Sequence, residues 1–182
     1  MTFAEHLITV PSIPRRLRAP VAASAMALVA LVSVVGLLAP STAAAQGSRA
    51  PAAQSVQSAA RVEDSLLVKI NNARVSQGGA RLAERSVLDT VARDQARRMA
   101  NRSLLFHNPE LATDVPNWKW VGENVGYGPD APTLHVAFMR SPAHRANILD
   151  RDYTEVGIGA VVVGNRVWVA EVFRRPMRTG TG

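Results

Sequence analysis

The spacing of apolar positions along the chain predicts two long helices. From Val62 these positions recur at intervals of four, four and three, which predicts a helix that ends at Gly78 and Gly79. A second helix is expected to begin at Ser86, a favourable N-cap residue. Its buried face is predicted to consist of Leu88, Val91, Ala92, Gln95, Ala96 and Met99.

The opposite face of this second helix is charged. Asp89 and Arg93 are four residues apart, as are Asp94 and Arg98, so we expect two ion pairs along an exposed surface. A solvated helix face explains the arginines of this segment better than a binding patch.

Three further segments have weaker patterns. Residues 101–117 contain two prolines and little periodicity, so we expect a long ordered loop, a kind of segment that is often functional. Short helices are expected over residues 132–139 and from Pro142 to about Leu149, the second with Ser141 as its N-cap.

The C-terminal part predicts a β-hairpin. Residues 155–163 and 166–173 are rich in β-branched residues, and Gly164 and Asn165 between them fit a two-residue turn of the primed type. Both faces of these strands are apolar, so both need a covering layer. We therefore predict an α+β fold, a three-layer α-β-α sandwich with a small antiparallel sheet.

The first fifty residues have the pattern of an export signal. A basic cluster at Arg15, Arg16 and Arg18 precedes a largely apolar run over residues 21–38, and Ala-Ala-Ala-Gln at 43–46 supplies a small-residue cleavage site. The alternative is an uncleaved membrane anchor, because eighteen residues are just enough to span a bilayer. We expect cleavage and a secreted or extracytoplasmic protein.

These patterns divide the chain into four parts. Residues 1–45 are the expected signal peptide, and the Ala/Gln/Ser-rich residues 46–61 are the expected flexible linker. The folded domain is predicted over residues 62–176, followed by a disordered tail over residues 177–182.

Composition restricts the chemistry of this domain. The 182-residue chain has no cysteine, which excludes disulfides, thiolate metal sites and thiol nucleophiles. For an exported protein, the net charge of +7 indicates an anionic envelope polymer or lipid as a partner rather than nucleic acid. The alternative is that the charge simply keeps the surface soluble. We expect a monomer.

Three ionisable residues are candidates for a functional site: His107 in the long loop, Glu123 between Gly122 and Asn124, and His144 in the last short helix. We expect a sharp turn around Glu123. Two imidazoles and a carboxylate can hold a zinc ion with one open position, although a lone histidine is more often structural.

Five motifs in sequence order resemble the CAP superfamily of cysteine-rich secretory proteins, antigen 5 and plant pathogenesis-related proteins, and in particular its cysteine-free secreted bacterial branch. Each motif alone is weak, but five in the same order are specific, and they cover residues 62–173. The motifs are N-N-x-R at 71–74, F-H at 106–107, G-E-N at 122–124, S-P-x-H-R-x-N-I-L at 141–149 and V-G-I-G at 156–159.

The resemblance implies a cleft lined by two histidines and acidic residues, with His107, Glu123 and His144 at the matching positions. A further glutamate of eukaryotic members falls at Ser141 here, so the four-residue set is incomplete. Some relatives bind zinc through the two histidines, some bind sterols or other lipids, and no shared catalytic activity defines the family.

Three hypotheses follow. The first is a non-catalytic extracytoplasmic binding module with no required cofactor, whose cleft holds a small ligand or weakly binds Zn²⁺ through His107 and His144. The second is a metal-assisted hydrolase with Glu123 as its catalytic general base. The third is a lipid- or envelope-associated structural protein, which would be membrane-bound only if the N-terminal segment is retained.

Overall fold

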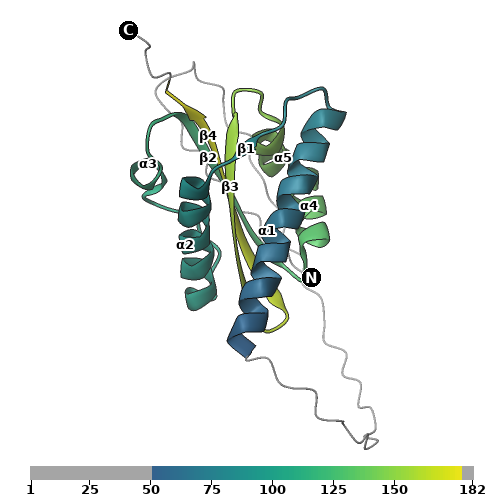
Figure 1. Ribbon diagram of the computed structural model, residues 1–182, viewed down its shortest axis with the longest axis vertical. Coiled ribbons are helices and arrows are strands. Elements are labelled where there is room, and N and C mark those ends of the chain that lie inside the picture. The colour runs from purple at the N-terminus through teal and green to yellow at the C-terminus, as the bar shows by residue number, and fades with distance from the viewer. Residues whose placement is uncertain (1–50, 178–182) are drawn as a thin grey trace, which may run out of the picture.

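A four-stranded sheet between two layers of helices forms the body of the protein (Figure 1). The computed structural model describes the backbone of residues 51–177 and the side chains of residues 58–177. Its elements are α1 (Pro51–Ser76), β1 (Ala83–Glu84), α2 (Ser86–Arg102), α3 (Leu111–Asp114), β2 (Trp118–Gly128), α4 (Ala131–Arg140), α5 (Pro142–Leu149), β3 (Glu155–Val163) and β4 (Arg166–Pro176).

The sheet has the strand order β1-β3-β4-β2, and it is mixed rather than purely antiparallel. Strands β3 and β4 form the predicted hairpin, and β2 pairs with β4 in antiparallel register from Trp118 to Gly128. The two residues of β1 pair in parallel with Glu155 and Val156 at the start of β3. Strand β2 was not predicted. The prediction of a sharp turn around Glu123 is wrong, because Glu123 lies within this strand and pairs with Val172.

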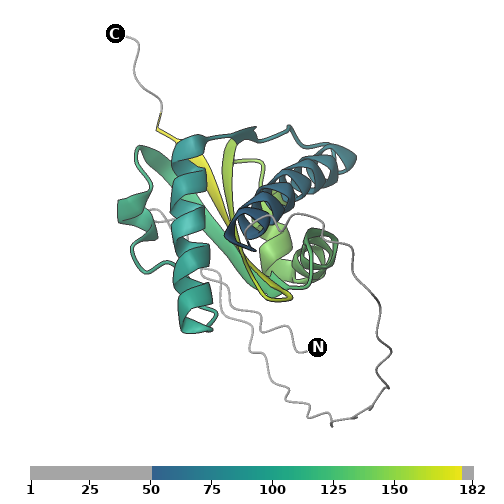
Figure 2. The same cartoon turned by 60° about the horizontal axis from the view of Figure 1, so that its bottom comes forward.

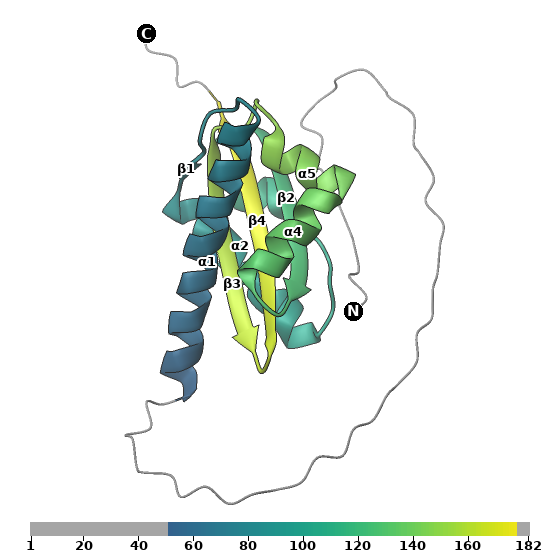
Figure 3. The same cartoon turned by 90° about the vertical axis from the view of Figure 1, so that its right-hand side faces the viewer.

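The helices cover both faces of the sheet, which confirms the predicted three-layer sandwich. Figure 3 shows α1, α4 and α5 on one side of the sheet, and Figure 2 shows α2 across the other. Each interface encloses a hydrophobic core, so both apolar faces of the hairpin are buried. The first core includes Leu66, Ile70, Leu134, Phe138, Ile148, Val156, Ile158 and Phe173, and the second includes Leu88, Ala92, Met99, Val121, Val125, Trp168 and Val172.

The first helix is longer than the sequence pattern predicted. It begins at Pro51, so most of the segment expected to be a flexible linker over residues 46–61 is helical. The segment lacks large apolar residues, but alanine is the strongest helix former and proline is favoured in the first turn. Residues 1–50 and 178–182, which include the expected signal peptide and tail, lie outside the described residues.

The charged face of α2 also differs from the prediction. Arg85 rather than Ser86 is the N-cap residue, and the two expected ion pairs do not form. Arg93 instead binds Glu63 of α1 at 2.6 Å, and Arg97 binds Asp94 at 2.6 Å. The predicted apolar face of α2 is confirmed, since all six of its residues are buried.

Two residues of the N-x-x-R pattern in α1 connect this helix to the loops at one end of the sheet. The Asn71 side chain exchanges two hydrogen bonds with the backbone of Leu82. The buried guanidinium of Arg74 donates to four backbone carbonyl oxygens, those of Ala80, Ile148, Asp150 and Tyr153. These motif residues are therefore structural.

The glycines of the V-G-I-G segment allow α2 to lie directly on β3. A β-carbon at Gly159 would be 2.0 Å from the backbone nitrogen of Arg93, and one at Gly157 would be 2.2 Å from the carbonyl carbon of Leu88. No side chain can occupy these positions unless the helix moves away from the sheet. This close approach fixes α2, and with it the loop that follows.

Candidate functional site: a buried histidine–glutamate pair

His107 and Glu123 form a buried pair between the loop after α2 and the middle of β2. The Nδ1 atom of His107 lies 2.8 Å from Oε2 of Glu123, and both side chains are almost completely buried. The same carboxylate oxygen accepts a hydrogen bond of 3.0 Å from the backbone N–H of Asn108. Because Oε2 already accepts from the N–H of Asn108, we take Nδ1 of His107 as a second donor to this oxygen.

Side chains of α2 and α3 hold the loop that carries His107. Ser103 ends α2 in the left-handed conformation, with φ of 48°. Beyond it, the buried side chain of Gln95 donates to the carbonyl oxygen of Phe106. The side chain of Asn108 donates to Asp114 of α3 at 2.9 Å. His107 is therefore placed by contacts on both of its neighbours in the sequence.

Glu123 and Asn124 point to opposite faces of β2, because successive side chains of a strand alternate. Glu123 shares the α2 face with Val121 and Val125, which belong to the second core. Asn124 points to the face covered by α4 and α5, and donates a hydrogen bond of 3.2 Å to the carbonyl oxygen of His144. His144 thus belongs to the layer opposite His107.

The imidazole of His144 lies against the ring of Phe138, with 4.8 Å between the ring centroids. Because β2 is an edge strand, groups from the two layers can approach one another only around its outer edge.

Asparagines connect the two sides of β2. Asn147 of α5 donates to the carbonyl oxygen of Glu123 at 3.3 Å and to the side-chain oxygen of Asn124 at 2.9 Å. Asn124 in turn donates to Oε2 of Glu171 at 2.9 Å. This hydrogen-bonded set, which we call the asparagine network, consists of Asn124, Asn147 and Glu171 and links α5 to β2 and β4.

Glu171 is a carboxyl group in the core. It is completely buried, and its Oε1 atom has no hydrogen-bond partner among the described residues. Burial raises the pKa of Glu171 to about 8, although the hydrogen bond from Asn124 opposes the rise. At neutral pH the group is therefore mostly protonated.

The structure unites part of the predicted site. It joins His107 to Glu123, and Asn124, the residue after Glu123, donates a hydrogen bond to the carbonyl oxygen of His144. Ser141 is the buried N-cap residue of α5. Within residues 58–177, no group of three or more histidine, aspartate or glutamate side chains is arranged to hold a metal ion. The sequence reasoning missed Glu171, although a lone acidic residue inside the apolar run V-W-V-A-E-V-F was a visible signal.

Two grooves on the surface lie apart from this pair. One, of about 460 Å³, is lined by α1, α2 and β3; the other, of about 550 Å³, lies near Trp118 and Met177. His107, Glu123 and His144 line neither groove, which agrees with their burial.

The chain is similar in sequence to known proteins. Residues 67–172 match the cysteine-rich secretory protein family, CAP. The uncharacterized protein YkwD of Bacillus subtilis is 30% identical over 115 residues, which is 58% of this chain and 44% of that protein. The chain thus spans less than half the length of this curated relative.

Solved structures share the fold. A cysteine-rich secretory protein of Staphylococcus aureus is 26% identical, with a TM-score of 0.57 over 66% of this chain and 40% of its own. An extracellular protein of Bacillus anthracis that contains an SCP domain is 20% identical, with a TM-score of 0.62 over 71% of this chain and 45% of its own. An outer surface protein of Borrelia burgdorferi is 15% identical, with a TM-score of 0.60 over 64% of this chain and 94% of its own.

Proposed function

Because the chain belongs to the cysteine-rich secretory protein (CAP) family, we propose that it is an extracytoplasmic binding module in which His107 meets the ligand. The observation that carries this proposal is the buried pair of His107 and Glu123. A carboxylate that accepts from Nδ1 fixes the orientation of the ring and makes the imidazole a better ligand. The pair thus orients the imidazole of His107 for binding.

A divalent metal is one class of ligand that fits this donor. When bound, Zn²⁺ would polarise an oxygen atom of a further ligand. His107 and His144 would supply nitrogen atoms, and the described residues offer no third ligand in a metal-binding arrangement. We therefore propose weak and exchangeable metal binding rather than a structural metal centre.

The hydrolase hypothesis is less well supported, because it requires Glu123 as a general base. One carboxylate oxygen of Glu123 already accepts from His107 and Asn108. The other, Oε1, is buried without a hydrogen-bond partner among the described residues. Glu123 is better placed to orient His107 than to activate water, which favours a non-catalytic role.

Secretion is part of the proposal. The basic cluster, the apolar run and the small-residue site of the first fifty residues support export, and two of the similar structures are named as extracellular or outer-surface proteins. No helix within residues 51–177 has the length and apolar character to cross a membrane. N-terminal sequencing of protein from the extracytoplasmic fraction should give a first residue at or near Gln46, whereas intact Met1 in the membrane fraction would support the anchor hypothesis.

Titration calorimetry with ZnCl₂ tests the binding proposal. Wild type should bind weakly, with an affinity that falls as the pH is lowered, since protonated imidazole is not a ligand. His107→Ala should abolish binding while circular dichroism shows a folded protein, and His135→Ala, on the helix α4, is the matched control. Metal binding that survives both His107→Ala and His144→Ala would contradict the metal proposal.

A further inference from the structure

The outer edge of β3 is covered over only part of its length. Strand β1 pairs with Glu155 and Val156 and then ends, and no other described strand lies beside β3 on that edge. An uncovered edge presents main-chain N–H and C=O groups that can pair with another chain. Figure 1 shows this part of β3 between α1 and α2.

Two carboxylates occupy the first part of the uncovered edge. Asp89 of α2 accepts a hydrogen bond of 3.0 Å from the backbone N–H of Ile158, and Glu63 of α1 accepts one of 2.9 Å from that of Ala160. Outward-facing groups recur at every second residue of a strand, so the next such position is Val162. No side chain among the described residues accepts a hydrogen bond from the backbone N–H of Val162.

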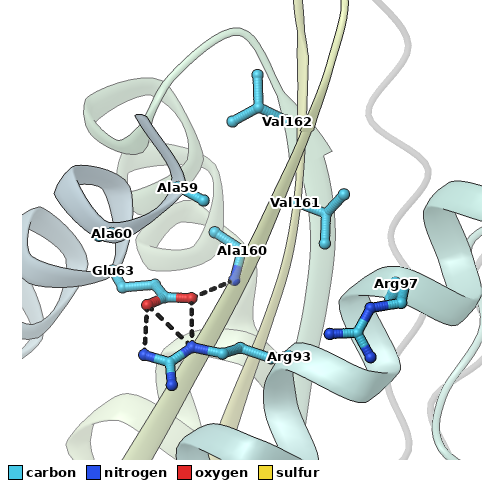
Figure 4. Close-up of a pocket in the computed structure, with 8 residues that line it drawn as sticks. All are labelled: Ala59, Ala60, Glu63, Arg93, Arg97, Ala160, Val161 and Val162. Atoms are coloured by element: carbon cyan, nitrogen blue, oxygen red, sulfur yellow. Dashed lines mark hydrogen bonds and ion pairs between the residues drawn. The ribbon is translucent and has the colours of Figure 1, made fainter. Parts of the chain in front are cut away.

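A groove of about 460 Å³ lies along this uncovered position, within the usual range for ligand pockets of about 300–1,000 Å³. Figure 4 shows its residues: Ala59 and Ala60 come from α1, Arg93 and Arg97 from α2, and Ala160 to Val162 from β3. The ion pair between Glu63 and Arg93 joins the two helices beside Ala160.

Charge in the groove favours an anionic partner. Glu63, a lining residue, neutralises Arg93, whereas Arg97 pairs with Asp94, which lies outside the lining. The ion pair between Arg97 and Asp94 is solvent-exposed on both sides, with exposed side-chain fractions of 60% and 52%. Exposed pairs of this kind contribute at most about 1 kcal/mol, so Arg97 can exchange Asp94 for another carboxylate at little cost.

We propose that this groove binds an extended peptide with a C-terminal carboxylate, which adds as a strand beside Val162 of β3 and places its carboxylate at Arg97. Main-chain pairing would supply the affinity, and the alternating side chains of the peptide would contact the alanine wall of α1. The edge lies between α1 and α2, so a single extended chain is a better fit than the sheet of a second copy. An acyl chain would match the apolar walls, but it has no donor or acceptor for the main chain of Val162.

The test uses the ¹⁵N-labelled protein and the peptide acetyl-Val-Thr-Val-Thr-Val with a free C-terminal carboxylate, followed by amide chemical shifts. Shifts should concentrate at Val161 to Val163 and at Ala60. The same peptide with a C-terminal amide should bind about threefold more weakly, as expected for an exposed ion pair. Ala60→Trp should fill the groove and abolish the shifts.

Variants of the arginines separate this proposal from non-specific attraction. Arg97→Ala should weaken the binding of the free-acid peptide about threefold and remove the difference in affinity between the acid and the amide. Arg140→Ala on α4 should leave both affinities unchanged. The proposal is overturned if millimolar peptide moves no amide at Val161 to Val163, or if acid and amide bind wild type equally. It is also overturned if decanoate binds the groove and the peptide does not.

Discussion

The buried acid Glu171 makes the stability of the protein depend on pH in a way that one substitution can remove. In the unfolded chain its pKa has the ordinary value of 4.5, whereas burial raises the pKa to about 8 in the folded protein. When the pKa of a carboxyl group is higher in the folded than in the unfolded protein, the protein is most stable below the unfolded pKa. It then loses stability as the pH rises toward the folded pKa. The relevant window is therefore pH 4.5 to 8.

The size of the effect follows from the difference between the two pKa values. Each pH unit within the window costs about 1.4 kcal/mol, so the penalty is about 3 kcal/mol at pH 7 and about 5 kcal/mol above pH 8. Glu171→Gln removes the ionisation but keeps an oxygen that can accept from Asn124. The variant should therefore become progressively more stable than wild type as the pH rises through the window.

Urea unfolding followed by tryptophan fluorescence, at pH values from 4 to 9, measures this difference. The slope of free energy against urea should be the same for both proteins, which confirms that only stability changed. The exposed Glu110, replaced by Gln, is the control and should give a profile parallel to wild type. Parallel profiles for Glu171→Gln and wild type across pH 4.5 to 8 would refute the reasoning.

Four other substitutions test the fold. Gly159→Ala puts a β-carbon into the backbone of α2, so unfolding free energy should fall by about 3 kcal/mol or more, measured by urea unfolding. Gly164 has φ of +59°, so Gly164→Val should reduce the free energy of unfolding by about 1–2 kcal/mol and lower the melting temperature. Asn165 has no positive φ, so Asn165→Val should leave the melting temperature nearly unchanged. Arg74→Met leaves four backbone carbonyls without their donor and should cost at least about 3 kcal/mol; an unchanged urea midpoint would contradict its structural role.

The sequence predicted elements whose apolar period is regular. The apolar face of α2 and the β3–β4 hairpin follow such patterns, and the structure confirms them. The short helices α4 and α5 are confirmed as well, although the second was predicted from Ser141 and Pro142 at its start. The primed turn needs one refinement, because only Gly164 of its two residues has a positive φ.

Strand β2 could not be predicted from local pattern, because its residues serve tertiary contacts. Its segment W-K-W-V-G-E-N-V-G-Y-G contains three glycines, which weaken a strand and normally indicate a turn. A β-carbon at Gly122 would be 2.4 Å from the hydroxyl of Tyr153, and one at Gly126 would be 2.9 Å from the ring of Phe138. The glycines are thus required by the packing of α4 and of Tyr153 on this strand.

The candidate site was predicted in part for a similar reason. Family resemblance identified His107, Glu123 and His144. That Glu123 and Asn124 point to opposite faces of the sheet follows only once strand β2 and its pairing are known. Asp89 is a related case, since it resembles an exposed residue of the first helical turn. It is in fact buried and accepts a hydrogen bond from the backbone of β3, 69 residues away.

The tautomer of His107 is the most direct test of the binding proposal, and a long-range ¹H–¹⁵N spectrum of the histidine rings measures it. His107→Gln assigns the resonance. We expect a proton on Nδ1, which donates to Glu123, and a change at the Nε2 resonance when ZnCl₂ is added. A proton on Nε2, or zinc binding that leaves the His107 ring unchanged, would contradict the assignment of this imidazole as the ligand-binding group.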